Sequence, residues 1–325
     1  MSVRMVDLGN DERDTGIRPF LYLLTTMAFF GSAFTSSKVV VGEVPHDVAA
    51  VLRFGGGALI LVVLLVLRPG PVSFSWRDLC RAGGVGLVGV FAYNFFFFWG
   101  VSLAPAIDGS IIVPVLSPVV TTAVLLASRQ ERAFAARIVG LLVGVAGAAV
   151  FFLGVGTRVH SVAAGSRLEG DLVYLMAAGC WAAYSIASKK VLAGMDPLRA
   201  TTYATGVGAL ALLLVAAPSM PTVRWSGVSA GVWANIAFLA IGPTAVAYLF
   251  YFRGLRSVSA VTATITMFAV PVFGTVSSVL FLGESFTPTQ ITGAVITVAG
   301  AFLAVTQGRS AGRKHKVQTT AAEQC

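Results

Sequence analysis

The sequence predicts an all-α integral membrane protein with ten transmembrane helices. Hydrophobic residues make up 56% of the 325 residues and charged residues only 11%, whereas a soluble domain has about 25% charged residues. Apolar runs of about 20 residues, long enough to cross a bilayer as a helix, recur throughout the chain. These runs do not alternate between apolar and polar residues, which favours helices over a β-barrel.

The ten predicted spans follow one another through short connections. They cover residues 19–41, 47–67, 82–103, 106–128, 135–154, 170–191, 198–217, 231–252, 258–282 and 288–306. The longest internal connections, 155–169 and 218–230, are too short to fold alone, so the activity is expected within the spans. Residues 1–18 form an N-terminal segment and residues 307–325 a basic tail, and both are expected in the cytoplasm.

The positions of lysine and arginine predict this orientation, with both termini inside. If the spans alternate from a cytoplasmic N-terminus, only Arg158, Arg167 and Arg224 of the 23 Lys and Arg residues fall in outer loops, and Lys38 and Arg53 fall within spans. The others lie in inner segments. Such an excess is typical of cytoplasmic loops, and removing one span would destroy it.

An internal duplication divides the spans into two sets of five. Matched positions return 151 to 154 residues later in the chain. They pair Lys38 with Lys189, Gly55 with Gly206, Gly100 with Gly254, Pro118 with Pro271 and Glu131 with Glu284. Because five is odd, the second set must enter the membrane in the opposite orientation. Inverted repeats provide two equivalent ways to close a protein, one at each face, and this is the geometry that alternating access requires.

Three stretches resemble the drug/metabolite transporter superfamily, specifically the ten-helix EamA-type carriers built from two EamA repeats. They are "FGSAFTSSK" (30–38), "CWAAYSIASKK" (180–190) and "PVFGTVSSVLFLGESFTPTQITG" (271–293). Two features depart from the family pattern. Phe30 stands where a tryptophan is frequent, and Arg129-Gln130 stand before Glu131 where small or apolar residues are usual. The resemblance implies repeats at 19–154 and 170–306, joined by an external linker at 155–169. It also implies a plasma-membrane carrier with a central cavity that moves small organic solutes, often amino acids or other metabolites outward.

An exporter of amino acids or related metabolites is therefore the leading interpretation. An uptake carrier or a multidrug or cationic-solute exporter is the alternative, and a channel or structural membrane protein is a different class. Enzyme chemistry is not expected, since His46, His160 and His315 lie in separate loops or the tail. The three scattered cysteines indicate neither a disulfide framework nor a metal site. The expected partners are a small solute and the lipid bilayer, without a cofactor or nucleic acid, and the protein is expected as a monomer or homodimer.

Arg53 is the first candidate for solute binding. It lies six residues after Asp47, roughly 9 Å along its helix from the outer boundary. A guanidinium inside a span either extends toward water, pairs with Asp47 or Asp108, or faces a cavity where it binds a carboxylate or phosphate. Its counterpart in the second repeat is Ala204, so this charge would be asymmetric.

The other binding candidates are polar or aromatic groups within spans, which need a partner or water. They are Asn94, Ser110, Ser117, Trp181, Tyr184, Tyr248 and Thr264. Each has a structural alternative: hydrogen bonding between helices for Asn94, bonds to the carbonyls of the same helix for the hydroxyls, and core packing for the aromatic residues.

Four charged residues near span ends are candidates for gating: Lys38, Asp108, Glu131 and Glu284. Lys38 is expected to extend its ammonium to the nearby outer surface, with a role at the outer gate as the alternative. Asp108 is expected to stabilise the N-terminus of its helix. No acidic residue lies near the middle of a span, so coupling to protons has no evident titratable group in the pathway.

Overall fold

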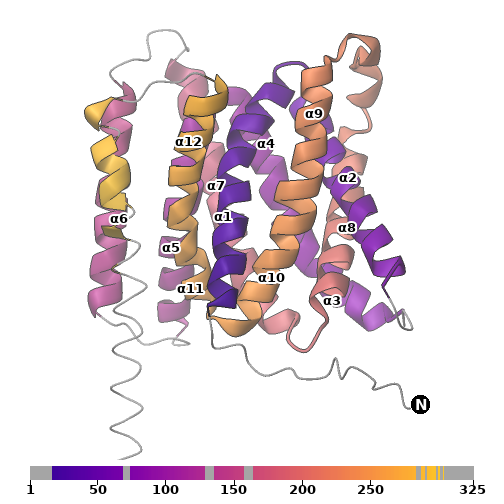
Figure 1. Cartoon of the computed structure of the whole chain (residues 1–325), viewed down its shortest axis with the longest axis horizontal. Helices are drawn as coiled ribbons and strands as arrows, with labels where there is room; N and C mark the ends of the chain where they lie inside the picture. The colour runs from indigo at the N-terminus through magenta and orange to yellow at the C-terminus, as the bar shows by residue number, and fades with distance from the viewer. Residues whose placement is uncertain are drawn as a thin grey trace, which may run out of the picture.

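The chain folds into a bundle of helices (Figure 1). The computed structural model describes residues 17–68, 74–128, 135–156, 164–282, 287–289, 291–297, 299–300 and 303. Within these ranges every regular element is helical. Six helices or joined helices there are long and apolar enough to cross a membrane: Arg18–Val41, His46–Val66, Trp76–Leu103, Asp108–Ala127, Pro197–Ala216 and Ala230–Ser257.

The order of elements follows the predicted spans. It is α1 (Arg18–Val41), α2 (His46–Val66), α3 (Trp76–Gly86), η1 (Leu87–Ala92), α4 (Tyr93–Leu103), α5 (Ala106–Ala127), α6 (Ala135–Gly156), α7 (Ala164–Val191), α8 (Pro197–Ala216), η2 (Met220–Thr222), η3 (Trp225–Gly227), α9 (Ala230–Leu239), η4 (Ala240–Val246), α10 (Ala247–Ser257), α11 (Ala260–Ile265), η5 (Thr266–Ala269) and α12 (Val270–Leu282). The predicted span 288–306 is described only in part, so the count of ten crossings stays a prediction.

Local sequence explains where these helices begin. The side chains of Ser75, Asp196 and Ser229 each accept a hydrogen bond from a backbone amide in the first turn of α3, α8 and α9, as N-capping residues do. Pro19 and Pro197 occupy first-turn positions, where the missing amide hydrogen carries no penalty.

Two long rods have the same interruption. The rod α3-η1-α4 and the rod α9-η4-α10 each contain a π-helical segment near the middle. Figure 1 shows α3 and α10 at one end of the molecule and α4 and α9 at the other, so the two rods run in opposite directions. Residues 87–92 and 241–246 are related by the 154-residue offset of the duplication.

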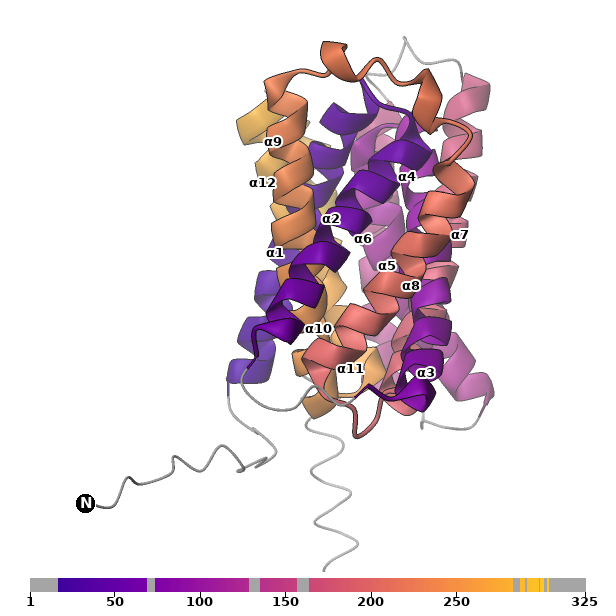
Figure 2. The same cartoon turned by 90° about the vertical axis from the view of Figure 1, so that its right-hand side faces the viewer.

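Glycines allow each rod to pack closely against the other half of the chain. A methyl group at Gly57 on α2 would overlap Thr244 in η4, and one at Gly208 on α8 would overlap Val90 in η1. A methyl group at Gly86 would overlap the carbonyl oxygen of Ala204. The two halves therefore interlock through equivalent contacts, as Figure 2 shows for α2 beside α9 and for α8 beside α3.

Glycines also join α6 to the last described segment of the chain. A methyl group at Gly147 would overlap the amide of Thr297, and one at Gly300 would overlap the amide of Gly144. Such small residues let helix backbones approach closely in membranes. The surface of α6 that carries Gly144 and Gly147 is thus covered by the chain itself.

Basic side chains gather at one end of the molecule, which is called the basic face below. It is the end where α1 and α8 begin and α2, α7 and α10 finish, and its described basic residues include Arg68, Arg81, Lys189, Arg199 and Arg256. The opposite end, where α4 finishes and α5 begins, is called the far face. In the described loop between α8 and α9 at the far face, Arg224 is the only basic residue.

An ion pair joins two loops at the basic face. Arg68 Nη1 lies 2.8 Å from Asp196 Oδ2, and the backbone amide of Arg199 donates to Asp196 Oδ1 over 3.0 Å. Burial alone would raise the pKa of the Asp196 carboxyl. The hydrogen bonds from Arg68 and Arg199, together with both arginine charges, nevertheless hold this pKa below its ordinary value.

Candidate functional site

Arg53 lies fully inside the bundle, on α2. Its side chain is 3% exposed, and its Nε donates to Thr244 Oγ1 in η4 over 3.1 Å. The guanidinium carbon lies 4.9 Å from the ring centroid of Phe54 and 5.6 Å from that of Phe97, within the range of cation–π attraction. Among the described residues, no carboxylate forms an ion pair with it. Its environment is therefore that of a buried positive charge surrounded by rings and hydroxyls.

A small cavity lies beside this guanidinium, between the two halves of the chain. Its lining residues are Phe30, Ala33, Phe34, Arg53, Tyr93, Phe97, Val113, Pro114, Tyr248, Met267 and Val270. The space is only about 10 Å³ for the centre of a water molecule, which is room for about one water. A larger molecule can enter only if the surrounding helices move apart.

Aromatic rings form the wall between the cavity and the basic face. Trp181 on α7 packs against Phe30, Tyr93 and Tyr248, with ring centroids 5.2, 4.9 and 6.1 Å away. Tyr184, one turn closer to the basic face, lies 5.3 Å from Trp181 and is fully buried. Trp181 and Tyr184 are thus not among the residues that line the cavity, whereas Tyr248 is.

Asn94 and Tyr248 bind the backbone at the first π-helical segment. Asn94 Nδ2 donates to the carbonyl of Val90 over 2.8 Å, and the Tyr248 hydroxyl donates to the carbonyl of Gly89 over 3.2 Å. A π-helical turn shifts the hydrogen-bond pattern of its helix, and here side chains satisfy the carbonyls involved. Asn94 therefore hydrogen-bonds within its own rod, and its Nδ2 also donates to the Tyr248 hydroxyl over 3.4 Å.

Ser110 and Ser117 do not line the cavity. Ser117 Oγ donates to the carbonyl of Val113 in its own helix over 2.7 Å and contacts the carbonyl of Ala178 at 3.2 Å. Ser110 is buried, and it packs where Gly274 of α12 approaches α5. Thr264 lies on α11, and its side chain is outside what the structure describes. From α5, Val113 and Pro114 line the cavity.

Lys38 and Lys189 make equivalent bonds at opposite ends of the molecule. Lys38 Nζ donates to the carbonyls of Val101 and Ala104 at the end of α4, over 2.8 and 3.1 Å. Lys189 Nζ donates to the carbonyl of Leu255 over 2.6 Å and to two further carbonyls at the end of α10. A cation here satisfies the last carbonyls of a helix and complements its dipole. Lys38 is half-buried, and its ammonium binds a helix end rather than extending freely to the surface.

The remaining gating candidates are partly visible. Asp108 is fully buried in the first turn of α5, close enough to Lys38 and Tyr174 to interact with both electrostatically. Glu131 and Glu284 lie outside the described residues. No group of three His, Cys, Asp or Glu side chains gathers as a metal site in the part of the chain that is described.

Sequence reasoning missed several residues of the cavity wall. Phe30, Tyr93 and Met267 line the cavity, and Thr244 binds the guanidinium. Phe30 could have been identified as a candidate, because it is the duplication counterpart of Trp181. The others lie in apolar runs where nothing in the spacing distinguishes a cavity residue from a lipid-facing one.

Residues 17–153 and 168–306 each match the EamA-like transporter family. The two matches are consecutive copies of one family unit. They cover most of the chain, and they fall on the two halves that the duplication relates.

Individual relatives have similar lengths. The chain is 26% identical over 286 residues to the uncharacterized transporter YyaM of Bacillus subtilis, covering 88% of this chain and 92% of that one. It is 26% identical over 302 residues to a probable terminal-alkyne amino-acid exporter of Streptantibioticus cattleyicolor, covering 91% and 96%. A solved crystal structure matches with a TM-score of 0.70 at 22% identity over 90% of this chain and 98% of the other, which supports the fold alone.

Proposed function

Because the chain belongs to the EamA-like transporter family, we propose that it exports amino acids or related small carboxylate metabolites across the plasma membrane by alternating access. It is a multi-pass membrane transporter rather than an enzyme. A relative named as a probable amino-acid exporter supports the solute class.

The environment of Arg53 is the observation that supports a carboxylate solute. A guanidinium inside a bundle is costly unless a counter-charge or water accompanies it. Here the described surroundings offer one hydroxyl and several rings, and no acidic partner. A carboxylate in the adjoining cavity would supply the missing negative charge through charge-assisted hydrogen bonds.

The same charge argues against a cationic solute. Rings such as those of Phe30, Tyr93 and Tyr248 alone would suit a cation through cation–π attraction. The fixed positive charge of Arg53 in the same cavity would repel one, and a repulsive element of this kind is a common source of specificity.

Matched features at both faces support alternating access. In each half a lysine binds the end of the long rod, Lys38 at the end of α4 toward the far face and Lys189 at the end of α10 toward the basic face. The rods themselves run in opposite directions. We therefore propose ten spans with both termini in the cytoplasm, repeats at 19–154 and 170–306, and the basic face inside, as lysine and arginine distributions favour.

Counterflow in proteoliposomes tests the function. Vesicles loaded with one standard L-amino acid at a time should accumulate the labelled form, and the corresponding amides, which lack the carboxylate, should not compete. Arg53→Gln should reduce counterflow at least about tenfold, equivalent to about 1.4 kcal/mol of lost binding, and Arg53→Lys should retain part of it. Arg224→Gln, which changes an exposed arginine at the far face, is the matched control. Undiminished counterflow in Arg53→Gln would rule out the assigned role.

Thiol labelling of intact cells tests the orientation. Cys80 on α3 is exposed near the basic face, so a membrane-impermeant maleimide should label it only after permeabilisation. Ser226→Cys, in the exposed α8–α9 loop at the far face, should be labelled without permeabilisation. The reverse pattern would invert the topology.

A further inference from the structure

A row of unpartnered polar atoms lies on α7 between the cavity and the basic face. Trp181 Nε1, Tyr184 Oη and Ser188 Oγ have no hydrogen-bond partner, although all three side chains are at most 2% exposed. Trp181 Nε1 lies near the Tyr251 hydroxyl and Tyr184 Oη near Ser188 Oγ, in both cases without hydrogen-bond geometry. Their spacing of three and four residues places them on one face of the helix.

This face of α7 packs against α10, and the contact between them is called the α7–α10 seam. Trp181 and Tyr184 lie 5.2 and 6.3 Å from the ring of Tyr251, and Tyr184 lies 6.1 Å from that of Phe252. At one end Trp181 contacts Tyr93 and Tyr248 of the cavity wall. The seam is therefore continuous with the cavity beside Arg53.

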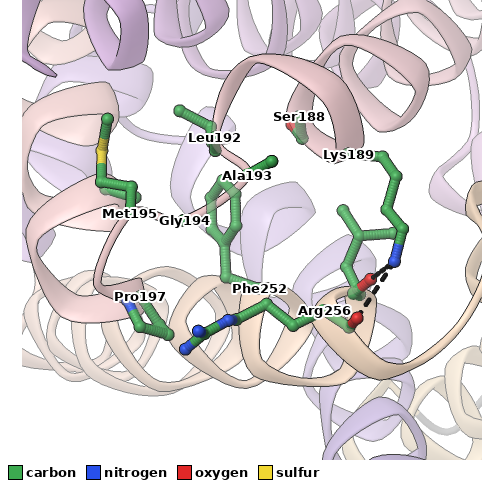
Figure 3. A pocket seen from close by; sticks show the side chains of 11 residues that line it. Ser188, Lys189, Leu192, Ala193, Gly194, Met195, Pro197, Phe252 and Arg256 are labelled. Carbon is green, nitrogen blue, oxygen red and sulfur yellow. Dashed lines mark hydrogen bonds between the residues drawn. The ribbon is translucent and has the colours of Figure 1, made fainter. Parts of the chain in front are cut away.

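At its other end the seam opens into a pocket of about 190 Å³ at the basic face. Figure 3 shows Ser188 at the top of this pocket, across from Phe252, with Lys189 and Arg256 beside it. The described lining contains no acidic residue. Lys189 donates to backbone carbonyls, so its charge is not neutralised by a carboxylate there.

The corresponding positions of the first half are apolar except for one serine. The counterparts of Trp181 and Tyr184 are Phe30 and Ala33, and the counterpart of Tyr251 is Phe97. Only the serine is retained, as Ser37. The indole and phenol groups of this seam thus occur only in the half that ends at the basic face.

We infer that the α7–α10 seam, with its basic-face pocket, is a second binding station for a carboxylate solute on its way to Arg53. An indole N–H can only donate a hydrogen bond, so the group that pairs with Trp181 must be an acceptor. Buried donors without partners are unfavourable, and a carboxylate can accept from several at once. This inference rests on the proposed function, because it assumes the same solute class.

Protection of a thiol in the pocket tests the station. Ala193 is an exposed lining residue, so Ala193→Cys, in a background with Cys80, Cys180 and Cys325 replaced by serine, should react with a charged methanethiosulfonate from the basic face. At concentrations several times its dissociation constant, the standard L-amino acid with the strongest counterflow should slow this reaction at least about fivefold, because the occupied fraction is shielded. Its amide should not.

Matched variants separate binding at the seam from general damage. Tyr184→Phe and Ser188→Ala should each raise the concentration for half-protection about fivefold or more. Tyr174→Phe removes another buried, unpartnered hydroxyl of α7, roughly 15 Å along the helix, and should leave it unchanged. In Arg53→Gln, protection should persist although counterflow is lost. Absent protection, equal protection by the amide, or unaltered protection in Tyr184→Phe would overturn the station. Arg53-dependent counterflow measured alongside would show that the proposed function survives that result.

Discussion

Replacing Arg53 by methionine should remove transport without reducing stability. The substitution loses the bond to Thr244 at 3.1 Å and the contact with Phe54 at 4.9 Å, which together contribute about 2 to 4 kcal/mol. It also removes the cost of holding a charge away from water, several kcal/mol for a buried ion. Methionine has similar length and fills irregular apolar space well. We expect a net change between about 0 and 3 kcal/mol in favour of the variant.

The assay is thermal unfolding of purified protein in detergent. The measured quantity is the fraction of protein that remains monodisperse after heating. The apparent melting temperature of Arg53→Met should be unchanged or higher by up to about 6 °C. Arg81→Met is the matched control, because Arg81 donates to the carbonyls of Val191 and Ala193 and lies 3.8 Å from Asp78. That variant should melt at a lower temperature. A fall of several degrees in Arg53→Met, or retained counterflow, would refute the view that this charge is kept for binding.

Three further predictions use the same thermal assay. Gly86→Ala should destabilise the protein by about 1 to 3 kcal/mol, because the added methyl group has no room. Gly84 has open space around it, so Gly84→Ala should be neutral or slightly stabilising. Equal effects of the two substitutions would contradict the close packing at Gly86. Lys38→Met and Lys189→Met should each cost about 1 to 2 kcal/mol, and a loss confined to one lysine would argue against their equivalence. Because the folded-state pKa of Asp196 is lowered, its contribution is complete above about pH 4 and is lost as the pH falls further. Asp196→Asn should therefore lose less stability on acidification than the wild type, and identical acid profiles would contradict this.

Periodicity and spacing predicted the features that depend on many residues at once. The positions of the helices follow from long apolar runs, and the helical elements agree with them from residue 18 to residue 282. The relation between Lys38 and Lys189 followed from the duplication, and the two ammonium groups do bind equivalent helix ends. Arg53 was predicted to lie within its run, but whether its guanidinium extends toward water, pairs with an acidic residue or faces a cavity was left open.

Details of the cavity wall could not be predicted because they depend on which way each side chain faces. Ser117 was a reasonable candidate as a polar group within a span, yet its hydroxyl donates to the carbonyl of Val113, and sequence does not reveal which partner it takes. Met267 and Tyr93 reach the cavity from runs that look uniformly apolar or aromatic. The π-helical segments have no sequence signature comparable to a cap or a turn.

Those two segments have a consequence for how solute specificity could change. One extra residue in a turn rotates everything after it by roughly 100° relative to an uninterrupted helix. Tyr93 follows η1 directly and Tyr248 lies two residues after η4. The direction in which both side chains point therefore depends on where the extra residue lies in the helix. Moving either bulge by one turn would present a different set of side chains to the solute while the amino-acid sequence stayed the same.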